Sequence, residues 1–333
     1  MKNFLLLKQS DRLAAIQLVS AELKISPVII EKDLWVTYIL NELFHFGKYK
    51  DSFVFKGGTS LSKAYGIIQR FSEDIDLVLD WRKLGYADNT PWEDRSNRQQ
   101  GLFNNEANEK AAKWINDTLK PDLEKIVSED ISDFEFSIKE NDPQTLMFRY
   151  PSIIASDLTG IEKSILLEIG PLAATIPKKD LNIISYVEEQ YPQFFEDESN
   201  IIPVVTAERT FWEKATILHA EAHRINSNVP ARYSRHYYDL YQLSKTPIKD
   251  LAIKNVDLLT QVVKFKKKFY PSNRAEYDLA TPATILLNPP KGQLDRLYKD
   301  YEAMQDMIFG ERVSFDDILK GIEALEKEIH RIE

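Results

Sequence analysis

Cysteine is absent from this chain of 333 residues. Its absence excludes disulfide bonds, catalysis by a thiolate and zinc sites with cysteine ligands, and it agrees with a reducing compartment. The sequence also lacks any apolar run of roughly 18 residues, so no membrane-spanning helix is expected. The apolar part of residues 1–8 is too short for the core of a signal peptide. We therefore expect a soluble, cytoplasmic protein with no membrane partner.

Positive charge is scarce as well, because 43 Lys and Arg residues stand against 52 Asp and Glu residues, for a formal net charge of −9. Broad binding to nucleic acid rests on cations that neutralise phosphates, so it is not expected. A local basic patch remains possible where cations alternate with aromatic residues that can stack on unpaired bases. The candidate RNA contacts are Lys264, Lys266, Lys267, Lys268 and Arg274. The alternative interpretation is the solvated end of a helix.

Strand-like runs in the first part of the chain predict an α/β (α+β) fold. Five runs are rich in apolar and β-branched residues and predict a mixed sheet of about five strands. These runs are Val54 with its neighbours, Asp74–Leu79, Phe134–Lys139, Thr145–Tyr150 and Ser164–Ile169.

Helical periodicity occurs on both sides of these strands. Residues 11–23, 27–44 and about 105–126 have this spacing, and the pattern is again helical after about residue 200 up to a last helix over residues 315–332. Residues 81–98 are polar and predict a loop that borders a cleft. We expect a domain over residues 1–200 and a helical domain over 201–333.

A glycine pair follows the first strand. Phe53–Phe55 is the expected strand, and the spacing of Leu61, Ala64, Tyr65 and Ile68 predicts a helix over residues 59–69. Glycine allows unusual dihedrals and a close approach of a ligand to the backbone. The turn, with free amides at the start of the helix, is therefore a candidate phosphate site. Its members are Gly57, Gly58 and the hydroxyls of Thr59, Ser60 and Ser62.

Two carboxylates, Asp74 and Asp76, stand two residues apart in the next strand. The strand period of two places both on one face, and paired hard oxygen ligands suit Mg²⁺ that also binds water and phosphates. The alternative is an edge strand with solvated acids.

A third acid, Glu168, lies in a mostly apolar run. A charge inside such a strand needs a partner or a metal, so Glu168 is a candidate base or ligand. Pairing with Lys163 or Arg149 is the alternative.

Two later helices add weaker candidates. Residues 206–222 have an apolar stripe with Thr206 as the expected cap, and Lys214 lies off that stripe. In residues 235–243, Asp239 lies opposite some of the packing residues, and its alternative role is an ion pair with Arg235.

The histidine pair His219 and His223 has a spacing that can bind zinc. No third ligand is evident, so a zinc site is not expected.

Taken in order, several of these segments resemble the AbiEii/MenT nucleotidyltransferase toxins, a branch of the DNA polymerase β nucleotidyltransferase superfamily. The first motif is matched by Lys56–Lys63 with Ser72–Leu77. Further matches are Glu31–Thr37, Glu208–Ala215 and Arg235–Tyr241, so the resemblance covers about residues 27–245.

The resemblance implies a polymerase β-like core and an enzyme that moves a nucleoside monophosphate from an NTP to an acceptor and releases diphosphate. It implies that Asp74 and Asp76 bind Mg²⁺ or Mn²⁺ and that Lys214 contacts the nucleotide phosphates. Asp239 would be a further essential acid, and the C-terminal domain would contribute it and Lys214 to the cleft. The nucleotide-binding set would also include Gly57, Gly58, Thr59, Ser60, Ser62, Lys63 and Ser72.

Characterised relatives include toxins that extend tRNA acceptor ends and are restrained by an adjacent antitoxin, whereas others have no settled target. An RNA acceptor such as tRNA and a cognate antitoxin are therefore expected partners. Superfamily members often have an acid on such a strand, usually aspartate, so a glutamate at position 168 departs from the pattern. Two alternatives stay open: a noncatalytic nucleotide- or protein-binding module on the same scaffold, or transfer to a small-molecule or protein hydroxyl.

Overall fold

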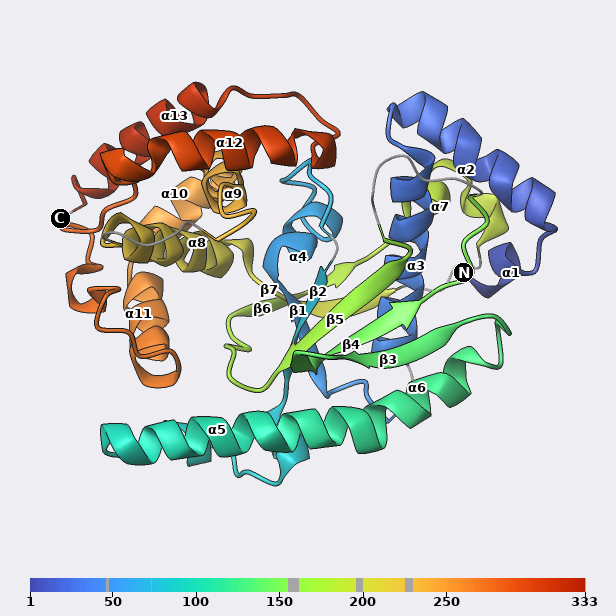
Figure 1. Cartoon of the computed structure of the whole chain (residues 1–333), viewed down its shortest axis with the longest axis horizontal. Helices are drawn as coiled ribbons and strands as arrows, with labels where there is room; N and C mark the ends of the chain where they lie inside the picture. Colours follow the sequence, from blue (N-terminus) through green and yellow to red (C-terminus); the bar gives the residue numbers. More distant parts are fainter. Residues whose placement is uncertain (46–47, 73, 155–161, 196–199, 225–229, 333) are drawn as a thin grey trace. The chain divides into compact units, whose positions relative to one another are not determined.

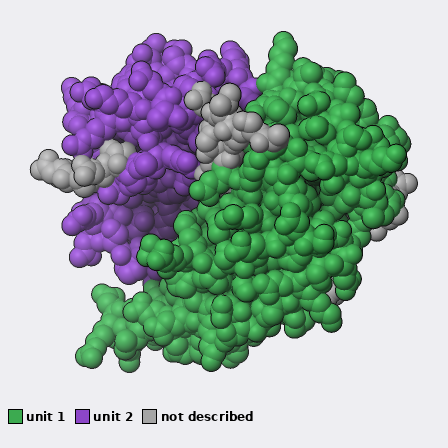
Figure 2. Space-filling model, turned by 45° about the vertical axis from the view of Figure 1, so that its right-hand side comes forward, with its two compact units in different colours: residues 1–64, 71–204 green, residues 65–70, 205–333 purple. Residues whose placement is uncertain are grey.

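The computed structural model describes residues 1–45, 48–72, 74–154, 162–195, 200–224 and 230–332. The chain divides into two compact units, drawn in green and purple in Figure 2. The first comprises Met1–Ala64 and Phe71–Val204, and the second comprises Tyr65–Arg70 and Val205–Glu333. A division near residue 200 was expected, but the expectation did not assign Tyr65–Arg70 to the second unit. This excursion of six residues interrupts the first unit in the sequence.

The first unit is built on a sheet of seven strands. The strands are β1 (Phe53–Lys56), β2 (Asp74–Leu79), β3 (Glu135–Lys139), β4 (Asp142–Arg149), β5 (Ser164–Gly170), β6 (Lys178–Asn182) and β7 (Ile201–Val205). Their order is β3-β4-β5-β2-β1-β7-β6 (Figure 1). The pairs β2–β5 and β1–β7 are parallel, whereas β1–β2, β3–β4 and β4–β5 are antiparallel. The expected mixed sheet is confirmed.

Two of the seven strands, β6 and β7, were not expected. The sequence of β6 is polar and almost entirely exposed, so it has no apolar alternation to find. Strand β7 contains Pro203, and proline inside a run argues against a strand.

The two faces of the sheet differ in burial. On one face, Ile75, Leu77 and Leu167 are almost completely buried. Trp35 covers this face, with its ring 6.2 Å from that of Phe148. The opposite face, here called the carboxylate face, carries the half-buried side chains of Asp74, Asp76 and Glu168. One face therefore forms the core and the other remains accessible.

Helices of the first unit are α1 (Lys2–Leu5), α2 (Gln9–Leu23), α3 (Pro27–His45), α4 (Gly57–Lys63), α5 (Asn97–Trp114), α6 (Lys120–Val127) and α7 (Tyr186–Gln190). A π-helical turn joins α5 to α6. The helix expected around residues 105–126 is present but begins earlier, because Ser96 and Gln99 form a capping box at Asn97. The polar segment 81–98 contains two short 3₁₀ turns.

The helix expected over residues 59–69 was wrong at its end. Helix α4 stops at Lys63, and Gly66 has a φ of +61°. A left-handed residue cannot continue a right-handed helix, so the chain turns there into the segment Tyr65–Arg70.

The second unit is helical from Ala207 onward, as expected. Its helices are α8 (Ala207–Ala222), α9 (Arg235–Ser244), α10 (Pro247–Lys254), α11 (Asp257–Phe269), α12 (Leu294–Met304) and α13 (Phe315–Ile329). The Thr206 hydroxyl accepts a hydrogen bond from the Arg209 amide, so the expected cap of α8 is confirmed. Phe211, Ala215 and Leu218 form its buried stripe.

Among the described helices, no single one is both long and apolar enough to cross a membrane. Helices α2 and α3 meet that test of length and composition only as a pair, with a bend of 113° between them.

Candidate active site

Three carboxylates meet on adjacent strands of the carboxylate face. Asp74 and Asp76 lie on β2, and Asp76 is in register with Glu168 on β5. Burial raises the pKa of Glu168 to about 7, and the charges of Asp74 and Asp76 add to the rise. The three acids are therefore close enough to repel one another.

The glycine turn packs directly on one of these acids. Gly57 has a φ of +80°, in the left-handed region. A Cβ built on Gly57 would lie 1.8 Å from Oδ2 of Asp76, closer than any two such atoms can come. Lys56, the residue before the turn, is in register with Asp76 on the neighbouring strand. Only glycine allows the turn and the carboxylate to approach this closely.

The hydroxyls of the turn donate to nearby backbone carbonyls. Thr59 donates to the carbonyl oxygen of Asp74, and Ser60 donates to that of Gly57 over 2.8 Å. Ser62 donates to the carbonyl of Thr59 over 3.0 Å. These bonds join the turn to the start of β2, so helix α4 and the carboxylate strand are positioned together.

Lys63, a predicted phosphate contact, is almost completely buried. Its Nζ lies 2.7 Å from Oδ1 of Asp33, donates to the carbonyl of Ile184 and stands over the ring of Tyr186. Asp33 also accepts a hydrogen bond of 2.8 Å from the Tyr186 amide. The last turn of α4 is thereby anchored to α3. The half-buried Ser72 lies two residues before the start of β2, and its nucleotide contact stays a prediction.

The neighbours of Asp33 on α3 are equally buried. Glu31 accepts hydrogen bonds from the Ser152 hydroxyl and the Ile153 amide, and Lys32 donates to the carbonyl of Glu162 over 2.9 Å. The segment Glu31–Thr37, which contributes to the family resemblance, is therefore fixed by buried polar contacts, and its Asp33 in turn positions Lys63 of α4.

Neither alternative partner of Glu168 is realised. Lys163 donates to the carbonyl of Ile154, and Arg149 lies 3.7 Å from Glu135. Among the described residues no group of three His, Asp or Glu side chains is arranged to enclose a metal ion by itself. Two or three crowded carboxylates nevertheless suit a hard divalent cation that completes its shell with water and phosphate oxygens.

In the second unit, Asp239 lies at the centre of a buried ion cluster. Its Oδ1 accepts a hydrogen bond of 2.7 Å from Arg70 Nε, and its Oδ2 accepts bonds of 2.9 Å from Arg70 Nη2 and 2.7 Å from Lys214 Nζ. Asp239 has no exposed surface. Although burial opposes ionisation, the charges of Arg70 and Lys214 hold the pKa of Asp239 well below its usual range. The expected alternative partner, Arg235, forms no ion pair with it here.

His236 completes this cluster, which we call the Asp239 cluster. Burial and the charge of Lys214 lower the pKa of His236 well below its usual value, so its ring is neutral at pH 7. Lys214 Nζ lies 3.2 Å from Nδ1 of His236, and an ammonium only donates, so Nδ1 accepts. Burial also lowers the pKa of Lys214.

Arg70 is the residue that sequence reasoning missed. Its partner lies 169 positions away, so no local pattern revealed the pair. The available signal was a cation four residues before Asp74, in a short segment between the glycine turn and the carboxylate strand.

Zinc binding by the histidine pair does not fit the contacts. The Leu286 amide donates to Nδ1 of His219, so the other ring nitrogen carries the proton and donates to the carbonyl of Glu276. Both nitrogens of His219 are thus occupied.

The basic run on and after α11 is only partly exposed. Phe265 and Phe269 point into the core, which leaves Tyr270 as the exposed aromatic side chain of the run. Lys267 pairs with Asp278, and Lys266 donates to the carbonyl of Glu213. Lys264 and Arg274 are exposed, and RNA contact by the run stays a prediction.

Comparison with known proteins agrees with the motifs. A family model described as the nucleotidyl transferase AbiEii toxin of a type IV toxin–antitoxin system matches residues 38–321. The nucleotidyltransferase toxin MenT4 of Mycobacterium tuberculosis H37Rv is a structural match with 17% identity and a TM-score of 0.43, covering 93% of this chain and 98% of that one. No curated protein matches. Because the family model spans most of the sequence, the chain belongs to the AbiEii family of nucleotidyltransferase toxins.

Proposed function

We propose that the protein transfers a nucleoside monophosphate from an NTP to a hydroxyl of an RNA acceptor, such as the 3′ end of tRNA. The observation that carries this proposal is the packing of the Gly57 backbone on Asp76, beside Asp74 and Glu168. It supports a triphosphate held at the turn, with its phosphorus atoms next to the carboxylates.

A divalent cation fits this donor set. Asp74 and Asp76 would hold Mg²⁺ or Mn²⁺, and the ion would offset the carboxylate repulsion that adds to the effect of burial on the pKa of Glu168. When bound, such an ion neutralises charge on the phosphates during an in-line displacement.

The reaction forms one bond and breaks another. The acceptor oxygen bonds to the α-phosphorus, the bond from that phosphorus to the bridging oxygen breaks, and diphosphate leaves. The hydroxyl proton needs a base, and Glu168 is the better candidate because it lies in register with Asp76 and because burial raises its pKa toward neutral pH. Asp239 is a poor base, since both of its oxygens already accept bonds from cations.

The identity of the acceptor and the presence of an inhibiting antitoxin are proposed from the family resemblance. We propose RNA as acceptor and a cognate antitoxin protein as partner, in line with the type IV toxin–antitoxin description of the family. We also propose that Lys214 contacts the nucleotide phosphates. In the structure, its ammonium forms an ion pair with Asp239 and a hydrogen bond with His236.

Labelled NTPs test the proposal. Purified protein is incubated with Mg²⁺, each labelled NTP in turn, and total tRNA, and the products are separated into RNA, protein and small molecules. We expect labelled tRNA with the wild-type protein and no labelled tRNA with Asp76→Ala. Label that enters protein or small molecules instead would replace the RNA acceptor, and transfer that survives Asp76→Ala would refute the mechanism. Growth arrest on expression, abolished by the same substitution, tests the toxin role.

A further inference from the structure

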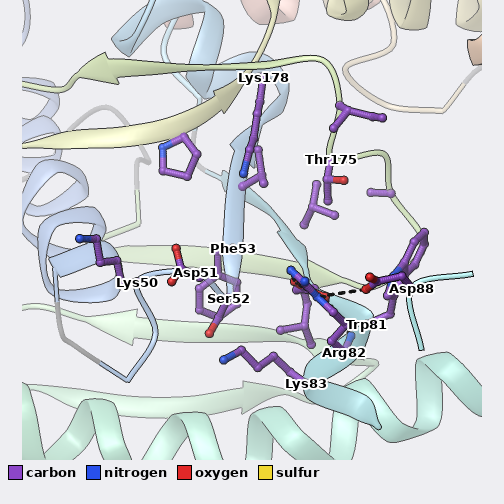
Figure 3. A pocket seen from close by; sticks show the side chains of 17 residues that line it. Lys50, Asp51, Ser52, Phe53, Trp81, Arg82, Lys83, Asp88, Thr175 and Lys178 are labelled. Carbon is purple, nitrogen blue, oxygen red and sulfur yellow. Dashed lines mark hydrogen bonds and ion pairs between the residues drawn. The ribbon is translucent and has the colours of Figure 1, made fainter. Parts of the chain in front are cut away.

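A cavity of about 860 Å³ opens in the first unit, at the end of β1 and β2 that lies away from the glycine turn (Figure 3). Its walls include Phe53 and Val54 at the start of β1 and Val78 at the end of β2. This volume is in the range of ligand pockets, roughly 300–1,000 Å³. Nothing in the reaction described above uses the cavity.

Its charge is opposite in sign to that of the whole chain. The lining contains four cations, Lys50, Arg82, Lys83 and Lys178, and three acids, Asp51, Asp80 and Asp88. The difference, four minus three, is one positive charge in a chain with a net charge of −9. The cavity is thus a local basic site on an acidic protein.

Most of the acidic charge is already paired. Arg82 Nε donates to Asp80 over 2.8 Å and lies 3.6 Å from Asp88. Within the described part of the chain, Lys50, Lys83 and Lys178 are exposed, and their ammonium groups form neither a hydrogen bond nor an ion pair. Figure 3 shows Lys178 extending toward the cavity from one side and Lys83 lying on the opposite side. These lysines are available to an anionic ligand.

The cavity continues the carboxylate face. Lys56 is in register with Asp76, and Val54 is in register with Val78 two residues further along the same face. At ~3.3 Å per residue, Asp80 lies about 13 Å along the strand from Asp76. The cavity and the carboxylates therefore lie on the same two strands, about 13 Å apart.

The lining chemistry points to nucleotides of a strand. Separate lysines on flexible stems act as point charges, which suit successive backbone phosphates. The half-buried Trp81 suits the flat face of a base. The triphosphate of the NTP already has its proposed place at the opposite end of β1. An acidic protein segment would use the lysines but leave the aromatic wall without a planar partner.

We infer that this cavity binds the single-stranded nucleotides of the RNA acceptor beside its reacting end, with Lys83 and Lys178 on backbone phosphates and Trp81 against a base. The inference rests on the proposed function for the identity of the acceptor as RNA.

The test is charge reversal in the double variant Lys83→Glu with Lys178→Glu. The matched control is Lys254→Glu with Lys299→Glu, two exposed lysines of the second unit. Affinity for labelled tRNA is measured by filter binding at several salt concentrations, and the KM for the NTP is measured in the transfer assay. Circular dichroism checks that both variants fold.

The cavity variant is expected to weaken tRNA binding at least about tenfold relative to the control and to lower the salt slope by about two. The KM for the NTP should stay within about twofold. Trp81→Leu should weaken binding of a single-stranded 3′-end oligonucleotide without changing the salt slope.

Equal tRNA affinity in the cavity variant and the control would overturn the inference while leaving tRNA labelling, and thus the proposed function, intact. A raised KM for the NTP with unchanged tRNA affinity would overturn the inference and indicate that the cavity binds the NTP. Displacement of tRNA by polyglutamate but not by polyuridylate would overturn the inference and indicate that the cavity binds an acidic protein segment. A wild-type enzyme that labels no RNA would refute both proposals together.

Discussion

Asp76 and Asp239 are both enclosed acids, but their surroundings differ in kind. Asp239 is completely buried and has two cations, Arg70 and Lys214, within 2.9 Å of its oxygens. Asp76 is half-buried and lies beside two other carboxylates and the backbone of Gly57, with Lys56 in register on the neighbouring strand. The Asp239 cluster holds one carboxylate between two cations, whereas the carboxylate face brings three carboxylates together on adjacent strands.

This contrast separates two uses of aspartate. A buried acid with its own cations contributes to the position and stability of the elements that carry it. Crowded acids on an accessible face raise the energy of the empty protein and are stabilised by a cationic ligand. The substitutions below test whether the contrast corresponds to function.

Asp76→Asn should have the largest effect. Loss of one carboxylate at the phosphate site removes several kcal/mol of transition-state stabilisation, so we expect the transfer rate to fall about ten-thousandfold. The rate is measured with the labelled NTP under single-turnover conditions. Asp180→Asn on the exposed strand β6 is the control and should stay near the wild-type rate. Equal losses in both variants would remove the distinction between the carboxylate face and other surface acids.

Asp239→Asn should act on stability. It leaves the buried charges of Arg70 and Lys214 without a counter-charge, which costs about 3–5 kcal/mol of the free energy of unfolding. Urea unfolding followed by circular dichroism measures the change. Asp250→Asn removes an exposed acid that lies 3.6 Å from Lys249, and it should cost less than about 1 kcal/mol. An Asp239→Asn protein as stable as the wild type would contradict a structural role for the cluster.

Gly57→Ala should reduce activity about 10- to 100-fold. The new methyl group would overlap the Asp76 carboxylate, and the left-handed backbone costs a further ~1–2 kcal/mol with a side chain. Steady-state kinetics measures the loss. Gly101→Ala in α5 is the matched control, because a Cβ there meets no atom within 4 Å. Unchanged kinetics in Gly57→Ala would mean that the contact with Asp76 is dispensable.

Glu168→Gln should have a small, pH-dependent effect on stability. The raised pKa means that, between the ordinary value of 4.5 and about 7, the folded protein keeps a proton that the unfolded chain has lost. Wild-type stability therefore falls as pH rises through this window, and the glutamine variant lacks that fall. Melting temperatures in EDTA should be similar at pH 4 and should diverge by a few degrees in favour of the variant at pH 8. Glu140→Gln, on an exposed turn, controls for the loss of one charge.

The carboxylate face was predictable because its information is local. The alternation of Asp74, Ile75 and Asp76 reveals the face, and the glycine pair reveals the turn. The packing of Gly57 on Asp76 was not predictable, because it depends on the antiparallel register of β1 and β2. The five expected strands are the contiguous part β3-β4-β5-β2-β1 of the sheet, whereas the polar edge strand β6 had no pattern to detect.

The Asp239 cluster was less accessible to sequence reasoning. Lys214 and Asp239 were found through the family motifs, but their helices gave them no feature that distinguished a buried ion pair from solvated charges. Lys63 illustrates the same difficulty, since its partner Asp33 belongs to another helix. Pairs that join distant segments require the fold before they can be recognised.

The excursion of Tyr65–Arg70 has a consequence for any attempt to divide this protein. The helical unit is completed by six residues that enter the sequence between the glycine turn and the carboxylate strand. A single cut near residue 204 would leave Arg70 on the fragment that lacks Asp239, and each fragment would retain an uncompensated charge. Coexpressed halves would need Arg70 supplied to the second fragment, so the chain is better shortened at its ends than split at its apparent boundary.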